Sequence, residues 1–234
     1  MSLAPRILAF DVFGTVVDWY GSIRREVEAM APGIDGDAFV RAWRAGYQPA
    51  MARVRRGELP WTTIDVLHRG ILDELLPTFG LESLDEATRR RLNAAWHRLD
   101  PWPDAVAALH RLKARYTICT LSNGNTGLLA NMAKRAGLPW DAILSAELFR
   151  HYKPDPQAYL GVATTFDVAP GEVMLVAAHK DDLDAAAACG LQTAHVARPE
   201  EFGPSVRKDV SPEPRFTLNA ADFHDLADQL GCPR

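Results

Sequence analysis

Strand-like runs that alternate with helical patterns are the feature that most restricts how this chain can fold. The strand-like runs lie at 6–10, 116–122, 142–146, 173–178 and 191–197, with a weaker one at 215–218. Several carry apolar side chains on both alternations, as strands do when both faces of their sheet are covered. From residue 100 onward, helical patterns separate them at 103–114, 125–137, 156–166 and 182–190. The alternation predicts an α/β fold with a mostly parallel sheet and helices on both faces.

Residues 19–99 differ from the rest of the chain because they contain no convincing strand. Amphipathic helical segments fill them, at 21–30, 37–57, 61–76 and 85–99. We therefore predict a core made of residues 1–18 and 100–234, with an all-helical subdomain, residues 19–99, inserted after the first strand. Residues 198–214 are rich in proline and charge and are interpreted as a surface loop.

The composition is that of an ordinary globular protein and excludes several classes of partner. Hydrophobic residues make up 47% of the 234 residues, and the formal net charge is −4, which gives no reason to expect nucleic acid. No apolar stretch reaches the ~20 residues of a membrane span, and no signal peptide is recognisable. The scattered Cys119, Cys189 and Cys232 are interpreted as reduced thiols of a cytoplasmic protein.

Polar side chains follow four of the predicted strands, at the point where each strand ends. They are Asp11, the pair Ser122 and Asn123, Lys153, and Asp182 in the cluster HKDD after 173–178. Each alone would usually be a turn residue, a helix-start charge or a solvated side chain. Because ligands bind at the carboxyl ends of parallel strands, we expect these side chains to converge on one site.

These residues occur in motifs that resemble those of the haloacid dehalogenase (HAD) superfamily. FDVFGT resembles its first motif, LSNG its second, YKPDP its lysine motif and the aspartates after VMLVAA its fourth. The helical insertion is similar to the cap that superfamily members carry after strand one. The resemblance implies a HAD-type, Rossmann-like core in which Asp11 is a nucleophile.

Two positions separate a dehalogenase from the phosphatases of this superfamily. In the phosphatases the first motif reads D-x-D-x-T, and its second Asp protonates a leaving alkoxide. Here that position is Phe13, which donates no proton. In the fourth motif, Ala177 and Ala178 stand where a phosphatase has an acid that helps to hold Mg²⁺, a cation that needs oxygen ligands. A halide leaves without a proton, so we expect carbon–halogen cleavage with no metal and no other cofactor.

The pattern is most similar to the type II, or L-2-haloacid, dehalogenases, because FDVFGTVVDW and AWRAGYQPAM resemble their motifs. That resemblance implies an aspartyl ester on Asp11, formed with inversion at C2 of a 2-haloalkanoic acid and then hydrolysed. It assigns further roles to residues that stabilise Asp11, bind substrate or position water. Thr15 would orient Asp11 and Lys153 would keep it ionised, while Tyr159 would contact Lys153 or Asp11. Ser122 would bind the substrate carboxylate, and Arg44 and Asn123 would surround the halide. Asp182 would position the hydrolytic water. Arg41 is an alternative to Arg44.

The fourth motif departs from the family pattern, which commonly reads S-S-N-x-x-D. Here His179 replaces the asparagine, and we hypothesise that its imidazole hydrogen-bonds the hydrolytic water and acts as its base. Phe13, Trp61 and His179 are bulky candidates for the pocket wall. Their bulk favours short acids such as haloacetates and 2-halopropionates, with fluoroacetate among the candidates.

Two other functions are compatible with the fold. One is a Mg²⁺-dependent phosphatase or phosphonatase-like hydrolase of a small metabolite, and the other is a catalytically silent binding protein. The intact Asp11, Ser122, Lys153 and Asp182 argue against silence, because a binding protein has no need of all four. Trp43, Tyr47 and Trp61, expected to be exposed on the insertion, favour a homodimer.

Overall fold

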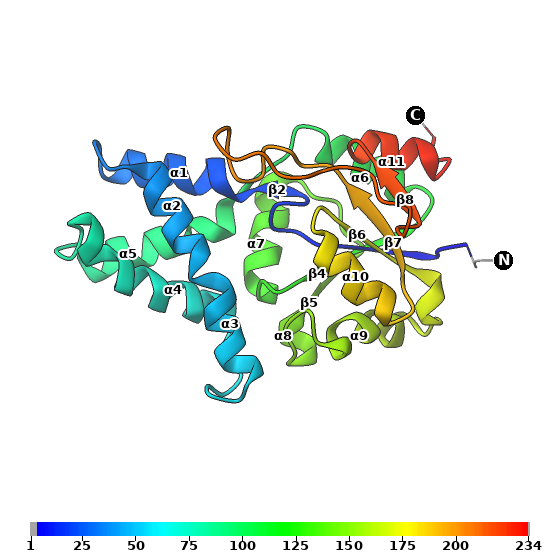
Figure 1. The fold of residues 1–234 in the computed structure, drawn as a ribbon, viewed down its shortest axis with the longest axis horizontal. Coiled ribbons are helices and arrows are strands. Elements are labelled where there is room, and N and C mark those ends of the chain that lie inside the picture. Colours follow the sequence, from blue (N-terminus) through cyan, green and yellow to red (C-terminus); the bar gives the residue numbers. More distant parts are fainter. Residues whose placement is uncertain (1–3, 234) are drawn as a thin grey trace.

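A six-stranded parallel sheet forms the centre of the computed structural model, which describes residues 4–233. Its order is β5-β4-β1-β6-β7-β8, and every neighbouring pair is parallel (Figure 1). The strands are β1 (Ile7–Phe10), β4 (Thr117–Ser122), β5 (Ala142–Ser145), β6 (Val173–Ala177), β7 (Gln192–Val196) and β8 (Leu218–Ala220). The sheet therefore has its central strand, β1, at the start of the chain, and the predicted fold class is confirmed.

Helices cover both faces of the sheet because its central strands are apolar on both sides. All residues of β1 and β6 are buried. One face packs against α6 (Ala105–Lys113), α7 (Thr126–Ala136) and α11 (Phe223–Gln229). The other packs against α9 (Pro156–Phe166) and α10 (Lys180–Ala188), and the short α8 (Ala146–Phe149) follows β5.

A helical insertion, residues 19–99, follows the first strand. It is entered and left through a two-stranded antiparallel ladder of β2 (Val17–Asp18) and β3 (Asp100–Pro101). Its α-helices are α1 (Trp19–Met30), α2 (Gly36–Ala45), α3 (Tyr47–Arg55), α4 (Ile64–Leu75) and α5 (Glu86–Asn93), with 3-10 turns at Leu76–Phe79 and Ala94–Arg98. Asp18, Asp35 and Asp85 cap α1, α2 and α5 by accepting a backbone N–H of the first turn.

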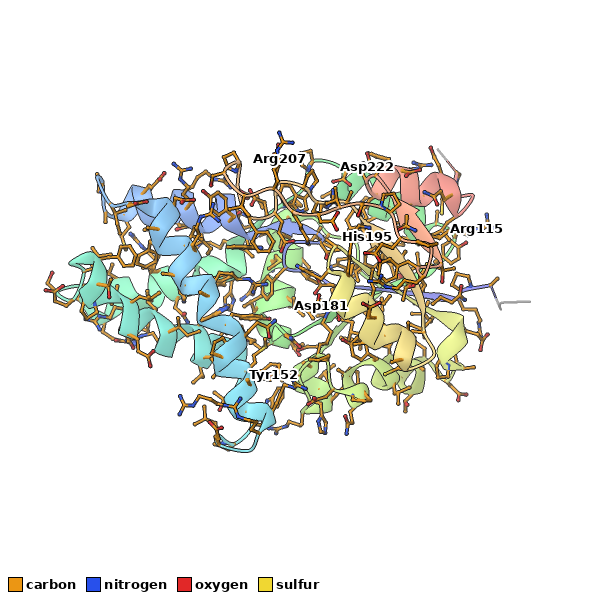
Figure 2. All side chains as sticks on the ribbon, viewed as in Figure 1. Arg115, Tyr152, Asp181, His195, Arg207 and Asp222 are labelled. Atoms are coloured by element: carbon orange, nitrogen blue, oxygen red, sulfur yellow. The ribbon has the colours of Figure 1, made fainter. Side chains whose placement is uncertain are left out.

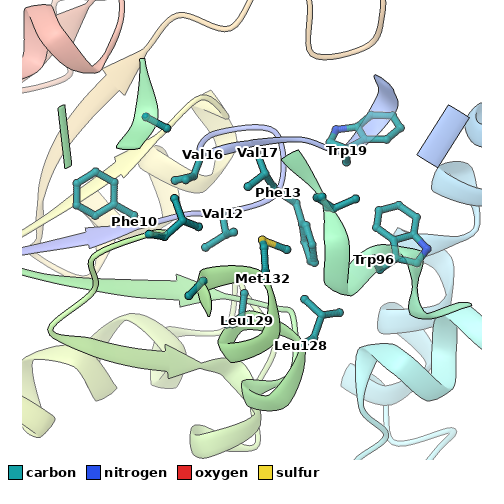
Figure 3. Close-up of a cluster of buried hydrophobic side chains, with 14 of the residues drawn as sticks. Phe10, Val12, Phe13, Val16, Val17, Trp19, Trp96, Leu128, Leu129 and Met132 are labelled. Carbon is teal, nitrogen blue, oxygen red and sulfur yellow. The ribbon is translucent and has the colours of Figure 1, made fainter. Parts of the chain in front are cut away.

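One hydrophobic cluster joins the sheet to the insertion (Figure 3). Phe13, in the turn after β1, lies between Trp96 of the insertion and Leu128 and Met132 of α7. The rings of Phe13 and Trp96 meet edge to face with centroids 5.9 Å apart. This packing holds the turn that follows Phe10 against both parts of the molecule.

The segment 37–57 forms two helices, where the sequence pattern predicted one. The break falls at Gly46, and Pro49 supplies the reason, since it has no N–H to bond the carbonyl of Ala45. Gly46 also lies against α4, where an added Cβ would be 2.5 Å from Cγ2 of Ile71.

Two expected boundaries and one expected surface were wrong. The last strand covers Leu218–Ala220 and not 215–218, and the helix expected from 182 begins at Lys180. Trp43 is 0% exposed because its ring packs inside the insertion, and Tyr47 is 4% exposed because its ring lies against Phe13 of the core. The expectation of a homodimer therefore loses most of its basis, although Trp61 is only half-buried and stacks on Tyr152.

Within residues 4–233, no helix is both long enough and apolar enough to cross a membrane. Cys119, Cys189 and Cys232 are all free thiols, as expected.

Removing the side chain of Leu8, fully buried in the central strand, tests how far the sheet determines stability. We expect Leu8→Ala to lower the free energy of unfolding by about 2–5 kcal/mol, because it leaves a cavity between packed layers. Urea unfolding followed by circular dichroism measures this. Val66→Ala, at a side chain 60% exposed on α4, is the control and should change it by less than about 0.5 kcal/mol. Equal losses in the two variants would contradict the assignment of the core.

Candidate active site

A cavity of about 400 Å³ lies at the carboxyl ends of the strands, between the core and α3 of the insertion. Its lining comes from both parts of the chain: Asp11, Phe13, Arg44, Tyr47, Gln48, Arg55, Asn123, Lys153, Pro154, Tyr159, His179, Asp181 and Asp182. In Figure 2, Asp181 marks the start of α10 on the side of the cavity, and Tyr152 lies beside the lower end of α3. The predicted convergence of strand-end side chains is thus observed for most of them.

Asp11 is the first residue beyond β1, and its backbone N–H still bonds the carbonyl of Val176 in β6. Oδ2 of its carboxylate accepts a 2.7 Å hydrogen bond from Oγ1 of Thr15 and lies 3.0 Å from Nδ1 of His179. The Thr15 hydroxyl itself accepts the N–H of Ala178, so its proton points at Asp11. Thr15 therefore orients the Asp11 carboxylate, which is the role that the first motif implied for Thr15.

Lys153 places its ammonium between two carboxylates. Nζ lies 2.9 Å from Oδ1 of Asp11 and 2.5 Å from Oδ2 of Asp182, and all three side chains are at least nine-tenths buried. Burial alone would raise the pKa of Asp11, but the Lys153 charge, the His179 ring and the Thr15 hydroxyl hold it well below its usual range. Burial would lower the pKa of Lys153, but the two carboxylates raise it. Asp11 is therefore a carboxylate and Lys153 an ammonium at neutral pH.

Asp182 lies in the first turn of α10, where the helix dipole favours a negative charge. Tyr159 donates its hydroxyl to Oδ1 of Asp182 at 2.7 Å, a contact different from the expected one with Lys153 or Asp11. Burial raises the pKa of Asp182, and Asp11 adds to the rise, while Lys153 and Tyr159 oppose it. Asp182 is thus the more basic of the two carboxylates.

His179 lies between two carboxylates, Asp11 and Glu201. Nε2 is 2.8 Å from Oε1 of Glu201, and Nδ1 is 3.0 Å from Oδ2 of Asp11. Burial would lower the pKa of the ring, but Glu201 and Asp11 raise it to about 9. Both nitrogens then carry protons at neutral pH, so His179 has no lone pair with which to take a proton from water. The hypothesis that His179 is a base does not fit this structure.

Arg44 enters the cavity from α2, whereas Arg41 does not line it. The Arg44 guanidinium lies 4.2 Å from the centre of the Tyr47 ring, and its buried Nη1 has no hydrogen-bond partner among residues 4–233. Arg41 is held by Asp37 and Ser205. The open choice between the two arginines is therefore resolved in favour of Arg44 as the one facing the cavity.

Of the other predicted binding residues, Phe13 and Asn123 line the cavity, whereas Ser122 and Trp61 do not. Asn123 also accepts the backbone N–H of Lys153 through Oδ1 at 2.8 Å, which ties two strand-end loops together. The Ser122 hydroxyl is fully buried and accepts the N–H of Gly124, so it shapes that loop. Trp61 packs on Tyr152 outside the cavity.

Several site residues escaped the motif analysis. Gln48 and Arg55 of α3 line the cavity, and Arg55 also pairs with Asp155 of the core at 2.7 Å. Lys180, the residue after His179, pairs with Asp209 and Glu213.

Glu201 was missed because residues 198–214 were interpreted as a surface loop, yet this side chain is 0% exposed. The sequence did contain a signal for Glu201 as a site residue. The strand β7 ends at the same edge of the sheet as β1 and β6, and an acidic pair, Glu200 and Glu201, follows β7.

Comparison with known proteins identifies the family. A sequence model described as haloacid dehalogenase-like hydrolase matches residues 5–190. The chain belongs to this family. The (S)-2-haloacid dehalogenase 4A of Burkholderia cepacia is 32% identical to this hydrolase over 216 residues, which are 85% of this chain and 88% of that protein.

Solved structures agree with the sequence comparison. The L-2-haloacid dehalogenase PA0810 superposes with a TM-score of 0.92 and 50% identity, covering 97% of this hydrolase and 100% of that chain. The defluorinating L-2-haloacid dehalogenase Rha0230 superposes with a TM-score of 0.94 and 46% identity, covering 97% and 96% of the two chains. The resemblance to the type II dehalogenases is thereby confirmed.

The protonation of His179 can be measured directly. Because its pKa is raised from 6.5 to about 9, the ring should stay doubly protonated at neutral pH and lose its proton as the pH rises through about 9. Its charge then stabilises the fold fully below pH 6.5, and that contribution disappears above about 9. Two-bond ¹H–¹⁵N NMR spectra of histidine-labelled protein report this.

His68 is the internal control, because burial and the nearby Arg44 lower the pKa of its ring to about 3, so it should stay neutral throughout. A His179 ring that titrates near pH 6.5 would contradict the assigned ion pairs.

Proposed function

We propose that this enzyme is a metal-independent hydrolytic dehalogenase of short 2-haloalkanoic acids, acting through an ester on Asp11. The observation that carries the proposal is a buried Asp11 carboxylate that faces a cavity and is kept ionised by Lys153, next to Phe13, which cannot protonate a leaving group. A chlorine or bromine substituent leaves as an anion and needs no such proton. The (S)-2-haloacid dehalogenase relatives support this chemistry.

In the first step, Asp11 attacks C2 of the substrate and the carbon–halogen bond breaks. The attacking oxygen is Oδ1, which accepts only the Lys153 hydrogen bond, whereas Oδ2 is occupied by Thr15 and His179. The electron pair of the broken bond leaves with the halide. Arg44 and Asn123 bind the departing halide ion, and Arg44 has an unpartnered N–H in the cavity wall for this contact. Attack from the rear inverts C2, so an (S)-acid gives an (R)-configured ester.

In the second step, water attacks Cγ of Asp11. Asp182 takes the proton of the water, since its raised pKa makes it the better base of the two aspartates. The bond between Cγ and Oδ1 then breaks, and the alkoxide receives that proton through Lys153, which contacts both Oδ1 and Asp182. The product is an (R)-2-hydroxyacid, and Asp11 regains a carboxylate when the second proton of the water, left on its new hydroxyl, is released to solvent.

The cavity favours small anionic substrates. The charge of the substrate carboxylate is attracted by the cations of its wall, Arg44 and Arg55 from the insertion and Lys153 from the core. Phe13, Tyr47 and His179 reduce the space beside Asp11. In this proposal, the insertion acts as a cap that supplies the halide side of the pocket, while the core supplies the nucleophile.

The residues of this site do not fit the Mg²⁺ that phosphatases of the superfamily use. Ala177 and Ala178 carry no side-chain oxygen, and both oxygens of Asp11 accept hydrogen bonds from the protein. The ammonium of Lys153 lies between the two carboxylates that could hold a cation. Within residues 4–233, no group of three His, Cys, Asp or Glu side chains is arranged for a metal. The phosphatase alternative is therefore disfavoured.

Fluoroacetate is proposed as one of the substrates. The chain is 46% identical to a structure described as a defluorinating L-2-haloacid dehalogenase. A short acid fits a pocket narrowed by Phe13 and His179. Fluoride is a poor leaving group that depends on hydrogen-bond donors, and the buried, unpartnered Nη1 of Arg44 is available as one.

Halide release tests the reaction class. We expect chloride from (S)-2-chloropropionate and fluoride from fluoroacetate at rates that EDTA does not change, because no step uses a metal. Asp11→Asn should abolish both, since an amide is not a nucleophile at this carbon. Ion chromatography measures the halides, and p-nitrophenyl phosphate with added Mg²⁺ is the parallel substrate.

Phosphate release that requires Mg²⁺, without halide release, would overturn the proposal. Chloride release without fluoride release would remove fluoroacetate alone.

The ester intermediate has an isotopic signature. A single turnover in ¹⁸O-water should place the label in the carboxylate of Asp11, because water attacks Cγ and the product keeps the oxygen that Asp11 supplied. Mass spectrometry of the peptide that contains Asp11, and of the hydroxyacid, locates the label. Label in the product of this first turnover, with none in Asp11, would mean direct displacement by water.

A further inference from the structure

A line of buried charges continues beyond Asp11 into the loop at 198–214. Glu201 accepts from His179 at 2.8 Å through Oε1, while its Oε2 is paired with Lys208. Nε1 of Trp19 also donates to Oε1 of Glu201, at 3.3 Å. Burial would raise the pKa of Glu201, but His179 and Lys208 lower it to about 2, so the side chain is a carboxylate throughout the neutral range.

The approach of Glu201 to this site is built into the turn that follows the nucleophile. Gly14 has a φ of +82°, and a Cβ there would lie 2.2 Å from Oε1 of Glu201, so both its conformation and its lack of a side chain are required. Arg198, in the same loop, donates Nε to the carbonyl of Thr15 at 2.9 Å and pairs with Asp104. The loop is thus fixed against the residues that position Asp11.

The two oxygens of Asp11 stand in different surroundings. Oδ1 has the single donor Lys153, and Oδ2 has two donors, the Thr15 hydroxyl at 2.7 Å and the His179 ring at 3.0 Å. If Oδ1 forms the ester, Oδ2 becomes its carbonyl oxygen. Two donors at 2.7–3.0 Å around a carbonyl oxygen are the arrangement that stabilises a tetrahedral oxyanion.

We infer that His179 is the oxyanion-stabilising donor of ester hydrolysis, and that Glu201 is the positioning residue that keeps the ring aimed at Oδ2 of Asp11. The inference rests on the proposed ester mechanism. When water adds to Cγ, the π electrons of the carbonyl move to Oδ2, the water proton goes to Asp182, and the imidazolium and Thr15 hydrogen-bond the new oxyanion. Collapse returns the electron pair and breaks the bond from Cγ to Oδ1. His179 gives up no proton in this sequence.

This role and a base role predict opposite dependence on pH. The groups that face the ring are Asp11 and Glu201, with Lys208 behind Glu201 and Lys153 behind Asp11. Lys180, next in sequence, is directed to Asp209 and Glu213. An imidazolium donor acts while it is protonated, so ester hydrolysis should slow as the pH rises through the pKa of His179. That pKa is about 9 beside the Asp11 carboxylate and lower in the ester, where Asp11 carries no charge. A base would act only above that pKa.

Rapid-quench kinetics with (S)-2-chloropropionate separate the two half-reactions. Chloride release reports formation of the ester, and the intact mass of the chain reports its decay. We expect His179→Ala to slow decay about 10²–10³-fold, the usual loss for one oxyanion donor, and to produce a burst of chloride as the ester accumulates. His179→Asn keeps a neutral donor, so it should retain more activity and show no loss of ester hydrolysis at alkaline pH.

Variants of the loop move the pH dependence in opposite directions. Glu201→Gln removes the negative charge that holds the proton on His179, so the alkaline loss of ester hydrolysis should shift to lower pH. Lys208→Met removes the cation that offsets Glu201, so the loss should shift to higher pH. Glu200→Gln, at the exposed neighbouring glutamate, is the matched control and should change neither the rate nor the pH dependence. A side chain that only stabilised the fold would not produce opposite shifts.

Ester hydrolysis that speeds up as His179 loses its proton in the wild type, with no such rise in His179→Asn, would assign His179 as a base and overturn the inference. Unchanged ester decay in His179→Ala would overturn it as well. Failure of the wild type to release any halide from 2-haloacids would instead reject the proposed function, which distinguishes the two results.

Discussion

The buried contact of Lys153 with Asp11 and Asp182 is the interaction on which the site depends. Two carboxylates in a partly dehydrated pocket repel each other, and burial favours their neutral forms. The ammonium between them offsets both effects. The two carboxylates still differ in basicity, because the ammonium contacts Oδ1 of Asp11, the proposed nucleophilic oxygen, while burial still raises the pKa of Asp182. This difference suits the two aspartates of one pocket to the proposed roles of nucleophile and base.

The same principle extends in the other direction from Asp11. Charges alternate along the series Lys208, Glu201, His179, Asp11, Lys153 and Asp182, and each neighbouring pair is in contact. Removing one member leaves a buried charge without its partner, and this lowers the stability of the fold by more free energy than the intact pair contributes. The series therefore explains why an imidazole next to a nucleophilic carboxylate is a cation here, and why the loop at 198–214 is part of the site.

Much of this could be predicted from local patterns. Apolar runs on both alternations indicated a sheet covered on both faces, and Asp11, Lys153 and Asp182 were identified because each follows a strand. Ser122 ends its strand as expected, but the pattern could not show that its hydroxyl accepts the N–H of Gly124, and its role in binding substrate stays a prediction. Trp43 and Tyr47 were misjudged because an amphipathic helix shows that one face is apolar, without showing what covers it.

The sequence by itself determined the fold class, the proposal of Asp11 as nucleophile and the lack of oxygen ligands at Ala177 and Ala178, because these follow from residue type and short-range spacing. Only the tertiary structure decided which arginine faces the cavity, and that Glu201 reaches His179 across the turn at Gly14. The physical reason is that the charge state of a buried group depends on its neighbours in space. The stretch at 179–182 shows a histidine beside aspartates, but the carboxylate of Glu201 makes that histidine a donor.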